Sequence, residues 1–287
     1  MMRQTTRVRI TASARGLAGF GLRYGLLLFV VVVSLAPFLW VVLSSFKTNV
    51  EVLGSALSLP ANPSLDGYVN ALTQTQFPRF FLNSVIASAG ATLLAVGIFG
   101  MAAYALARHQ FRGARAIYAL LISTLLISLI PMQQPITLVI RTLGLYDTLW
   151  ALILVYAAKG LPIAIFILHS YFKTIPKDLE EAAALDGANM WQTYVHVALP
   201  LARPAIAAAS VLIFLNSWND FLFPLLLTQS EESRTLSYAL RFFLNAFAQD
   251  YPTLLAAVVL TLIPSVVVYV LLQEQIQKSL IGGAVRG

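Results

Sequence analysis

The chain has 287 residues, of which 59% are hydrophobic and only 11% are charged, and its formal net charge is +7. A soluble globular domain carries about 25% charged residues, so this composition excludes an ordinary soluble fold. The chain contains no cysteine, which excludes disulfides and thiol chemistry. A basic and strongly apolar chain of this kind is typical of a protein that crosses a membrane several times.

Six apolar stretches are long enough to cross a bilayer as helices. A helix rises about 1.5 Å per residue, so about 20 residues span a hydrocarbon core of roughly 30 Å. Helices are favoured there because the hydrocarbon offers no water to backbone amides. The stretches are Tyr24–Phe46, Phe80–Ala107, Ala116–Ile140, Thr148–Leu168, Pro204–Thr228 and Thr253–Leu272. The first exceeds the apolar core of a signal peptide, so we interpret it as an uncleaved span. We predict an all-α, six-helix transmembrane domain over residues 1–287.

The basic residues predict the orientation, because cytoplasmic loops are enriched in Lys and Arg. With six spans, both termini lie on one side of the membrane. That side carries thirteen Lys and Arg residues: Arg3, Arg7, Arg9, Arg15, Arg23, Arg108, Arg112, Arg115, Lys173, Lys177, Arg203, Lys278 and Arg286. The other side carries Lys47, Arg79, Arg141, Arg234 and Arg241. We therefore expect both termini of this multi-pass protein to be cytoplasmic. The positive charge then contacts anionic lipid rather than nucleic acid.

Prolines interrupt two of the predicted spans. Pro131 and Pro135 fall in the third, and Pro162 follows Gly160 in the fourth. An interior proline removes a backbone hydrogen bond and kinks a helix. Such kinks suit a pore-lining helix, but they also occur in ordinary membrane helices whose neighbours satisfy the carbonyls.

Residues 174–200, between spans four and five, form a polar and helix-prone segment. Thr174 is positioned to cap a first helix, and Gly187 can supply the left-handed residue that ends it. Asn189 is positioned to cap a second short helix, which we expect Pro200 to stop. This hairpin either rests on lipid headgroups or is presented to a partner protein. Its acidic residues disfavour contact with an anionic lipid surface.

The same hairpin carries a spaced motif. Glu181-Ala182-Ala183, Gly187, and Leu199-Pro200 match the pattern E-A-A-x3-G-x9-I-x-L-P, with Val197 at the Ile position. This pattern resembles the EAA loop of ATP-binding-cassette (ABC) importer permeases. The resemblance implies that the loop, Asp186 included, docks on an ATPase subunit and passes its movement to the transmembrane helices.

Two further segments resemble the carbohydrate-uptake branch of that family. Residues 217–226 are similar to a run in the fifth helix of those permeases, and residues 280–287 are similar to the end of the smaller subunit of maltose-type permeases. In that subunit the tail reaches between two ATPase subunits, which implies ATPase contacts for Gly282, Gly283 and Arg286. The last external loop, residues 229–251, is shorter than its counterpart, so we assign it no sugar-displacing role.

Lys159 and Asp220 fall inside predicted spans. They lie roughly 16 and 12 Å from the outer ends of those spans, at about 1.5 Å per residue. An unpaired charge at such depth costs at least about 2.5–3.5 kcal/mol, so we expect the two either to pair or to face an aqueous pathway. The nearby Asn216, Trp218 and Asn219 are candidates for contacting a sugar. Alternatively, Lys159 extends toward the interface and Asp220 only caps a local kink.

The sequence contains no recognisable catalytic motif. It has no Gly-Lys dipeptide and therefore no Walker A loop, and its three histidines lack metal-ligand spacing. The resemblance implies a non-enzymatic permease subunit for a sugar or oligosaccharide, in a bacterial or archaeal cytoplasmic (inner) membrane. Polyols and glycerol-phosphate esters also fit. Its implied partners are a second permease, two ATPase subunits that hold ATP and Mg²⁺, and an extracytoplasmic solute-binding protein. The rival hypothesis is an autonomous ion-coupled secondary transporter, which often carries an inverted repeat. We find no such repeat in the sequence.

Overall fold

The structure is a computed structural model that describes residues 5–55, 58–73, 76–238 and 250–284, with side chains described from Arg23 to Glu274 within those ranges. All regular elements in these ranges are helical. They are α1 (Thr5–Ser44), α2 (Asn49–Gly54), α3 (Asp66–Thr73), α4 (Phe77–Arg108), α5 (Ala114–Ser123), η1 (Thr124–Leu126), α6 (Gln133–Thr142), α7 (Leu149–Phe172), α8 (Asp178–Leu185), α9 (Met190–Thr193), η2 (Tyr194–Ala198), α10 (Leu199–Leu201), α11 (Arg203–Trp218), α12 (Leu222–Leu227) and α14 (Tyr251–Ala284). The predicted all-α fold is confirmed.

Four helical segments in the described ranges are long and apolar enough to cross a membrane. They are Arg23–Ser44, Phe77–Arg108, Leu149–Phe172 and Tyr251–Glu274. A fifth is added if Met190–Leu201 and Arg203–Trp218, which meet at 77°, count as one span. The four continuous helices coincide with the first, second, fourth and sixth predicted spans, while the total of six stays a prediction.

The third predicted span, residues 116–140, is not one continuous helix. Helix α5 ends at Ser123, a short η1 turn follows, and α6 begins only at Gln133. The interruption starts upstream of both prolines, so it is not the proline kink that the sequence suggested. Pro135 lies in the first turn of α6, where a missing N–H removes no helical hydrogen bond. In contrast, Pro162 lies inside the continuous helix α7.

The fifth predicted span, residues 204–228, is also divided. Helix α11 ends at Trp218 and α12 begins at Leu222, with residues 219–221 between them. The Asp220 Oδ1 atom accepts the backbone N–H of Phe223 at 3.0 Å, which satisfies a donor in the first turn of α12. A polar residue therefore stabilises the start of a helix within an otherwise apolar segment.

By their internal contacts, residues 1–69 and 249–259 form one unit, and residues 70–248 and 260–287 form another. In the first unit, the Tyr251 backbone N–H donates to the Asn49 side chain at 3.1 Å. Gly67 lies so close to Pro252 that a Cβ atom there would come within 2.8 Å of the carbonyl oxygen. The apolar side chains of α1, such as Leu28 and Phe29, are exposed, as expected of a helix that faces lipid.

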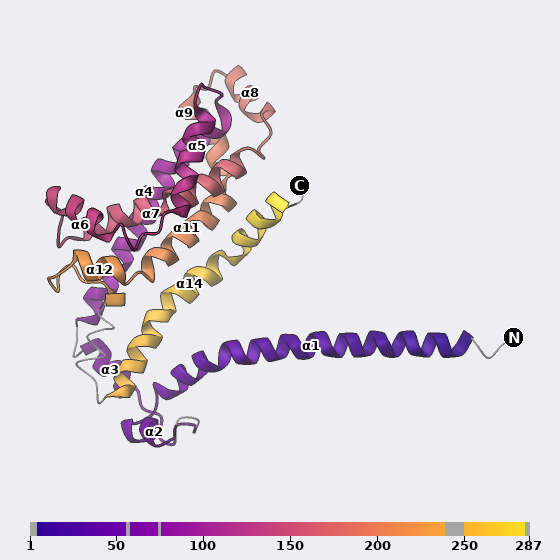
Figure 1. Ribbon diagram of the computed structural model, residues 1–287, viewed down its shortest axis with the longest axis vertical. Coiled ribbons are helices and arrows are strands. Elements are labelled where there is room, and N and C mark those ends of the chain that lie inside the picture. The colour runs from indigo at the N-terminus through magenta and orange to yellow at the C-terminus, as the bar shows by residue number, and fades with distance from the viewer. Residues whose placement is uncertain (1–4, 56–57, 74–75, 239–249, 285–287) are drawn as a thin grey trace. The chain divides into compact units, whose positions relative to one another are not determined.

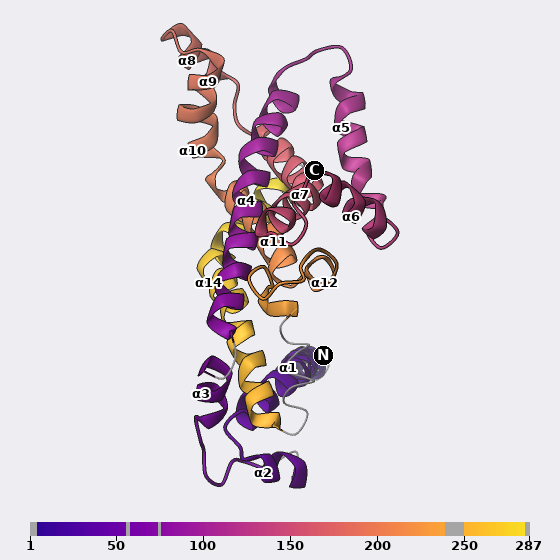
Figure 2. The same ribbon diagram turned by 90° about the vertical axis from the view of Figure 1, so that its left-hand side faces the viewer.

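In the second unit, α4, α7 and α11 pack together through small residues. Ala87, Ala91 and Ala95 of α4 are fully buried. A Cβ atom on Gly160 of α7 would lie 3.0 Å from Ile213 of α11 and 3.2 Å from Ala95. Small residues permit such close approach in lipid, where packing replaces the hydrophobic effect. In both views α8 and α9 lie at one end of these helices, and α12 lies toward the other (Figures 1 and 2).

Candidate functional site

The α8–α9 hairpin is closed by a glycine in the left-handed conformation. Gly187 has φ +87°, and its N–H donates to the Ala184 carbonyl at 3.1 Å. The N–H of Ala188 donates to the Ala183 carbonyl at 2.9 Å. These two bonds form a Schellman motif, which satisfies the last carbonyls of α8 and favours glycine at the left-handed position. The left-handed conformation predicted for Gly187 at the end of the first helix is confirmed.

Asn189 begins the second limb as the sequence predicted. Its side chain accepts the Gln192 N–H at 2.9 Å, and the Gln192 side chain accepts the Asn189 N–H at 2.8 Å, which together form a capping box. The cap expected from Thr174 is wrong: its hydroxyl donates to the Tyr171 carbonyl at 2.8 Å. The helical run that begins at Met190 ends at Leu201, one residue after the stop expected at Pro200.

Large apolar side chains are exposed on the outside of this hairpin. Leu185, just before the glycine turn, is 89% exposed, and Trp191 on the second limb is 59% exposed. Glu181, Ala182 and Asp186 of the motif are exposed beside them. Ala183 and Leu199 are partly covered, and Pro200 is exposed. The motif therefore forms a surface with apolar and acidic side chains next to one another.

The structure adds a residue that sequence reasoning missed. Arg108, at the end of α4, lies with its Nε 2.8 Å from the Glu180 Oε1 of α8. The sequence carries no signal of this contact, because the two residues are far apart in the chain and neither Arg108 nor Glu180 belongs to the spaced pattern.

Lys159 and Asp220 meet between α7 and the break after α11. The Lys159 Nζ lies 2.6 Å from the Asp220 Oδ2, and their side chains are 26% and 7% exposed. The pairing expected from their depths is therefore present. Both line a polar pocket of about 480 Å³, together with Asn216, Asn219 and four apolar residues.

Trp218 does not line this pocket. Its side chain is 2% exposed, and its indole N–H donates to the Thr261 carbonyl at 3.2 Å. Asn216 and Asn219 share one helix face because they are three residues apart, whereas Trp218 is turned away from that face. In this structure, Trp218 therefore offers no stacking surface to a solute in the pocket.

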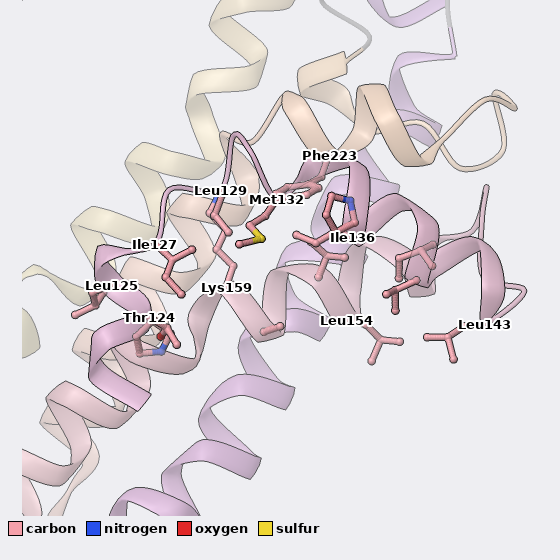
Figure 3. A pocket seen from close by; sticks show the side chains of 16 residues that line it. Thr124, Leu125, Ile127, Leu129, Met132, Ile136, Leu143, Leu154, Lys159 and Phe223 are labelled. Atoms are coloured by element: carbon pink, nitrogen blue, oxygen red, sulfur yellow. The ribbon is translucent and has the colours of Figure 1, made fainter. Parts of the chain in front are cut away.

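A larger apolar cavity of about 660 Å³ adjoins Lys159 on another side. It is lined by residues of the α5–α6 interruption, by α6 and α7, and by Phe223 of α12. Figure 3 shows Lys159 among apolar side chains that include Ile127, Leu129 and Met132. Because Lys159 lines both spaces, the ion pair stands where the apolar cavity and the polar pocket adjoin.

Asp147 anchors the segment that follows α12. Its carboxylate accepts the backbone N–H groups of Gln229 at 2.7 Å and Ser230 at 3.0 Å, and it also accepts the Ser233 hydroxyl. Burial raises the pKa of Asp147, but the hydrogen bonds from Ser233, Gln229 and Ser230 outweigh it and lower that pKa below its ordinary value. The carboxylate is therefore ionised at neutral pH and holds its three donors as a charged acceptor.

Some candidate residues lie close to or beyond the ends of the ranges that the structure describes. Gly282 and Gly283 lie near the end of α14, and Arg286 lies outside the described residues. Residues 239–249 of the last predicted external loop also lie outside them. Within the described ranges, no cluster of three or more His, Cys, Asp or Glu side chains could hold a metal ion.

Residues 14–282 match the family of binding-protein-dependent transport system inner membrane components. The chain is a permease of this family. The permease is 37% identical over 265 residues to the diacetylchitobiose uptake system permease protein of Streptomyces coelicolor, covering 92% of this chain and 88% of that relative. It is 34% identical over 259 residues to the trehalose/maltose transport system permease protein of Thermococcus litoralis, covering 89% and 93%.

The fold of the permease is similar to that of a solved chain from a bacterial ABC transporter involved in the import of the acidic polysaccharide alginate. The TM-score is 0.74 at 24% identity, and the match covers 96% of this chain and 98% of that chain. The predicted ABC importer permease is therefore confirmed, and the ion-coupled secondary transporter is disfavoured.

Proposed function

We propose that the permease imports a sugar or oligosaccharide and that its α8–α9 hairpin receives the movement of a partner ATPase. The observation that carries this proposal is the exposed apolar surface around Leu185 and Trp191, held by the Gly187 turn. Burying apolar area contributes about 25 cal/mol per Å². Aromatic residues also supply much of the binding energy at protein interfaces. A partner cleft that covers these side chains therefore stabilises the complex.

The acidic residues of the hairpin indicate the chemistry of that partner. Glu181 and Asp186 are exposed next to the apolar side chains, so a docking surface with an apolar floor and a basic rim complements them. Ala182 is exposed beside Glu181 and allows the partner to approach the helix backbone closely. Gly282, Gly283 and Arg286 at the end of the chain are proposed as a second contact with the ATPase subunits.

The polar pocket at Lys159 is proposed as part of the route of the solute. Asn216, Asn219 and the ion pair offer hydrogen-bond donors and acceptors, which suit the hydroxyl groups of a carbohydrate. Diacetylchitobiose and trehalose/maltose, the solutes in the names of two relatives, are carbohydrates. This similarity is the reason for proposing a sugar rather than another polar solute.

The proposed assembly contains this chain, a second permease, two ATPase subunits and an extracytoplasmic solute-binding protein. ATP and Mg²⁺ are bound by the ATPase subunits, and this chain itself hydrolyses no ATP. Both termini and the α8–α9 hairpin lie in the cytoplasm. Closure of the ATPase pair then draws the hairpins together and opens the route toward the binding protein.

The test is uptake by the complete complex in proteoliposomes, with labelled disaccharides and oligosaccharides supplied to the binding protein. We expect uptake to require ATP on the hairpin side and to persist when ionophores collapse ion gradients. Uptake that follows an ion gradient without ATP would contradict the proposal. Trp191→Ala should reduce co-purification of the ATPase, whereas Trp150→Ala should not, although both tryptophans are 59% exposed.

A further inference from the structure

Arg108 joins the coupling hairpin to a helix that is not its neighbour in the chain. It lies in the last turn of α4, and its Nη2 donates to the Ile175 carbonyl at 2.8 Å. Its Nε lies 2.8 Å from the Glu180 Oε1 of α8, although these two atoms are not aligned for a hydrogen bond. The Arg108 and Glu180 side chains are only 5% and 16% exposed. The guanidinium therefore contacts α8 and the segment before it in a place that excludes most water.

The second limb of the hairpin contacts the same end of α4. Tyr104, one turn before Arg108, is buried, and its ring centroid lies 5.0 Å from that of Tyr194 in η2. The Tyr104 ring also lies 5.3 Å from the Phe172 ring at the end of α7. Trp191, on α9, contacts Tyr194 with ring centroids 5.7 Å apart. Both limbs of the hairpin therefore contact the last two turns of α4.

The chain connects the hairpin to α7 and α11 less directly than the Arg108–Glu180 contact connects it to α4. Residues 173–177, between α7 and α8, are not helical. On the other side, Met190–Leu201 meets Arg203–Trp218 at an angle of 77°. Neither connection is a straight continuous helix. The Arg108–Glu180 contact instead leads directly into α4, a helix from Phe77 to Arg108 that packs against α7 and α11.

We propose that Arg108 is a positioning residue that transmits displacement of α8 to α4, and through α4 to the transport pathway. This inference rests on the proposed function, because it assumes that an ATPase moves the hairpin. This role requires no contact between Arg108 and solute or nucleotide. Its role is to keep α8 and the end of α4 together while the hairpin moves.

The chemistry of the side chain suits this role. A planar guanidinium presents several N–H groups in a fixed arrangement, so one arginine can contact a carboxylate and a carbonyl at the same time. A lysine has one compact ammonium group and cannot reproduce that geometry. The low exposure of Arg108 and Glu180 strengthens their attraction, because little water screens the two charges.

The test compares Arg108→Gln, Glu180→Gln and the swap Arg108→Glu with Glu180→Arg, each in the complete complex in proteoliposomes. The readout is the amount of sugar transported per ATP hydrolysed, normalised to assembled complex. We expect each single variant to lower this ratio about tenfold, within the range of coupling between distant sites. The swap should recover only part of it, because it restores the ion pair but not the hydrogen bond to the Ile175 carbonyl. Arg108→Lys should fall between wild type and Arg108→Gln. The matched control is the exposed Arg112→Gln, which should leave the ratio unchanged.

A loss of stability alone would reduce the amount of complex without changing the ratio. If Arg108→Gln and Glu180→Gln both keep the wild-type ratio, the proposal is overturned. It is also overturned if the swap lowers the ratio by as much as the two single variants combined. Glu180→Gln, which nearly conserves side-chain shape, provides the decisive measurement if Arg108→Gln does not assemble. Failure of the proposed function is distinguishable, because the wild-type complex would then show no ATP-dependent sugar uptake.

Discussion

Lys159 and Asp220 form an ion pair between α7 and the break that separates α11 from α12, with Nζ and Oδ2 2.6 Å apart. Asp220 uses both of its carboxylate oxygens, because Oδ1 accepts the Phe223 N–H at 3.0 Å. One side chain therefore neutralises a cation inside an apolar region and also satisfies the start of α12. This double role explains how a helix break is stabilised within an apolar segment.

Neutralising Lys159 should destabilise the permease more than neutralising Asp220. Lys159→Met leaves Asp220 unpaired where it is 7% exposed, whereas Asp220→Asn leaves a lysine that is 26% exposed. Removing one partner of a buried pair costs roughly 3–5 kcal/mol. We therefore expect Lys159→Met to lower the thermal unfolding temperature of the solubilised complex more than Asp220→Asn. The amide oxygen that Asp220→Asn introduces can still accept the Phe223 N–H.

The double variant Lys159→Met with Asp220→Asn should recover most of the lost stability, since replacing both charges leaves no unpaired ion. Asn216→Ala is a control, because Asn216 lines the same pocket outside the ion pair. Strictly additive losses in the double variant would show that the pair contributes no coupling energy.

Features governed by short-range hydrogen bonds could be predicted from the sequence. The left-handed Gly187 and the Asn189 cap follow from bonds between residues a few positions apart, so local residue types specify them. The Lys159–Asp220 pair could also be predicted, because the two opposite charges lie at similar distances from the outer ends of their predicted spans. The spaced pattern from Glu181 to Pro200 indicates the family of ABC importer permeases.

Features that depend on tertiary packing could not be predicted in the same way. Residues 116–140 are apolar throughout, and apolarity alone does not distinguish one helix from two helices joined by an irregular segment. Trp218 is a candidate for contacting a sugar by its residue type alone. Its position on the helix, however, turns the side chain toward Phe214 and Thr261. The Arg108–Glu180 contact depends on how α4 and α8 pack, for which the sequence offers no local signal.

Gly187→Val should reduce transport while the subunit still inserts into the membrane. Gly187 has φ +87°, and a β-branched residue resists this conformation at a cost of about 1–3 kcal/mol. A Cβ atom at this position meets no other atom within 4 Å, so backbone strain rather than a clash causes the effect. The measurement is ATP-dependent sugar uptake, together with stimulation of the ATPase by the loaded binding protein.

Gly54→Val is the matched control, because a Cβ atom at Gly54 also meets nothing within 4 Å and its φ is not positive. We expect that variant to transport at the wild-type rate. Wild-type uptake by Gly187→Val would refute the assignment of this hairpin as the coupling element.

The anchor at Asp147 should weaken in acid. Its pKa is lowered in the folded protein, so the stability it contributes is fully present above its unfolded value of about 3.9. That contribution is lost as the pH falls from that value through the lower folded pKa. Hydrogen exchange at the Gln229 and Ser230 amides, corrected for intrinsic rates, should therefore stay slow near neutral pH and become faster below about pH 4.

Asp147→Asn should expose the same two amides at neutral pH, because a neutral acceptor binds its donors less strongly than a carboxylate. The variant should also lose the acid dependence. Exchange in the wild-type protein that is equally slow at pH 3 and pH 7 would mean that another contact holds the segment.

Removing residues 282–287 should lower ATP hydrolysis by the assembled complex without preventing membrane insertion. The apolar run predicted for the sixth span ends at Leu272, but helix α14 continues to Ala284. The residues after Leu272 extend the helix by about 18 Å beyond this apolar run, at about 1.5 Å per residue. A helix that projects this far into water carries the tail toward the proposed ATPase subunits.

The measurement is ATPase activity per assembled complex, compared with a variant in which residues 282–287 are replaced by six Gly and Ser residues. Both variants should be equally impaired if the native side chains make the contact, whereas unchanged activity and transport in both would show that the tail has no part in coupling.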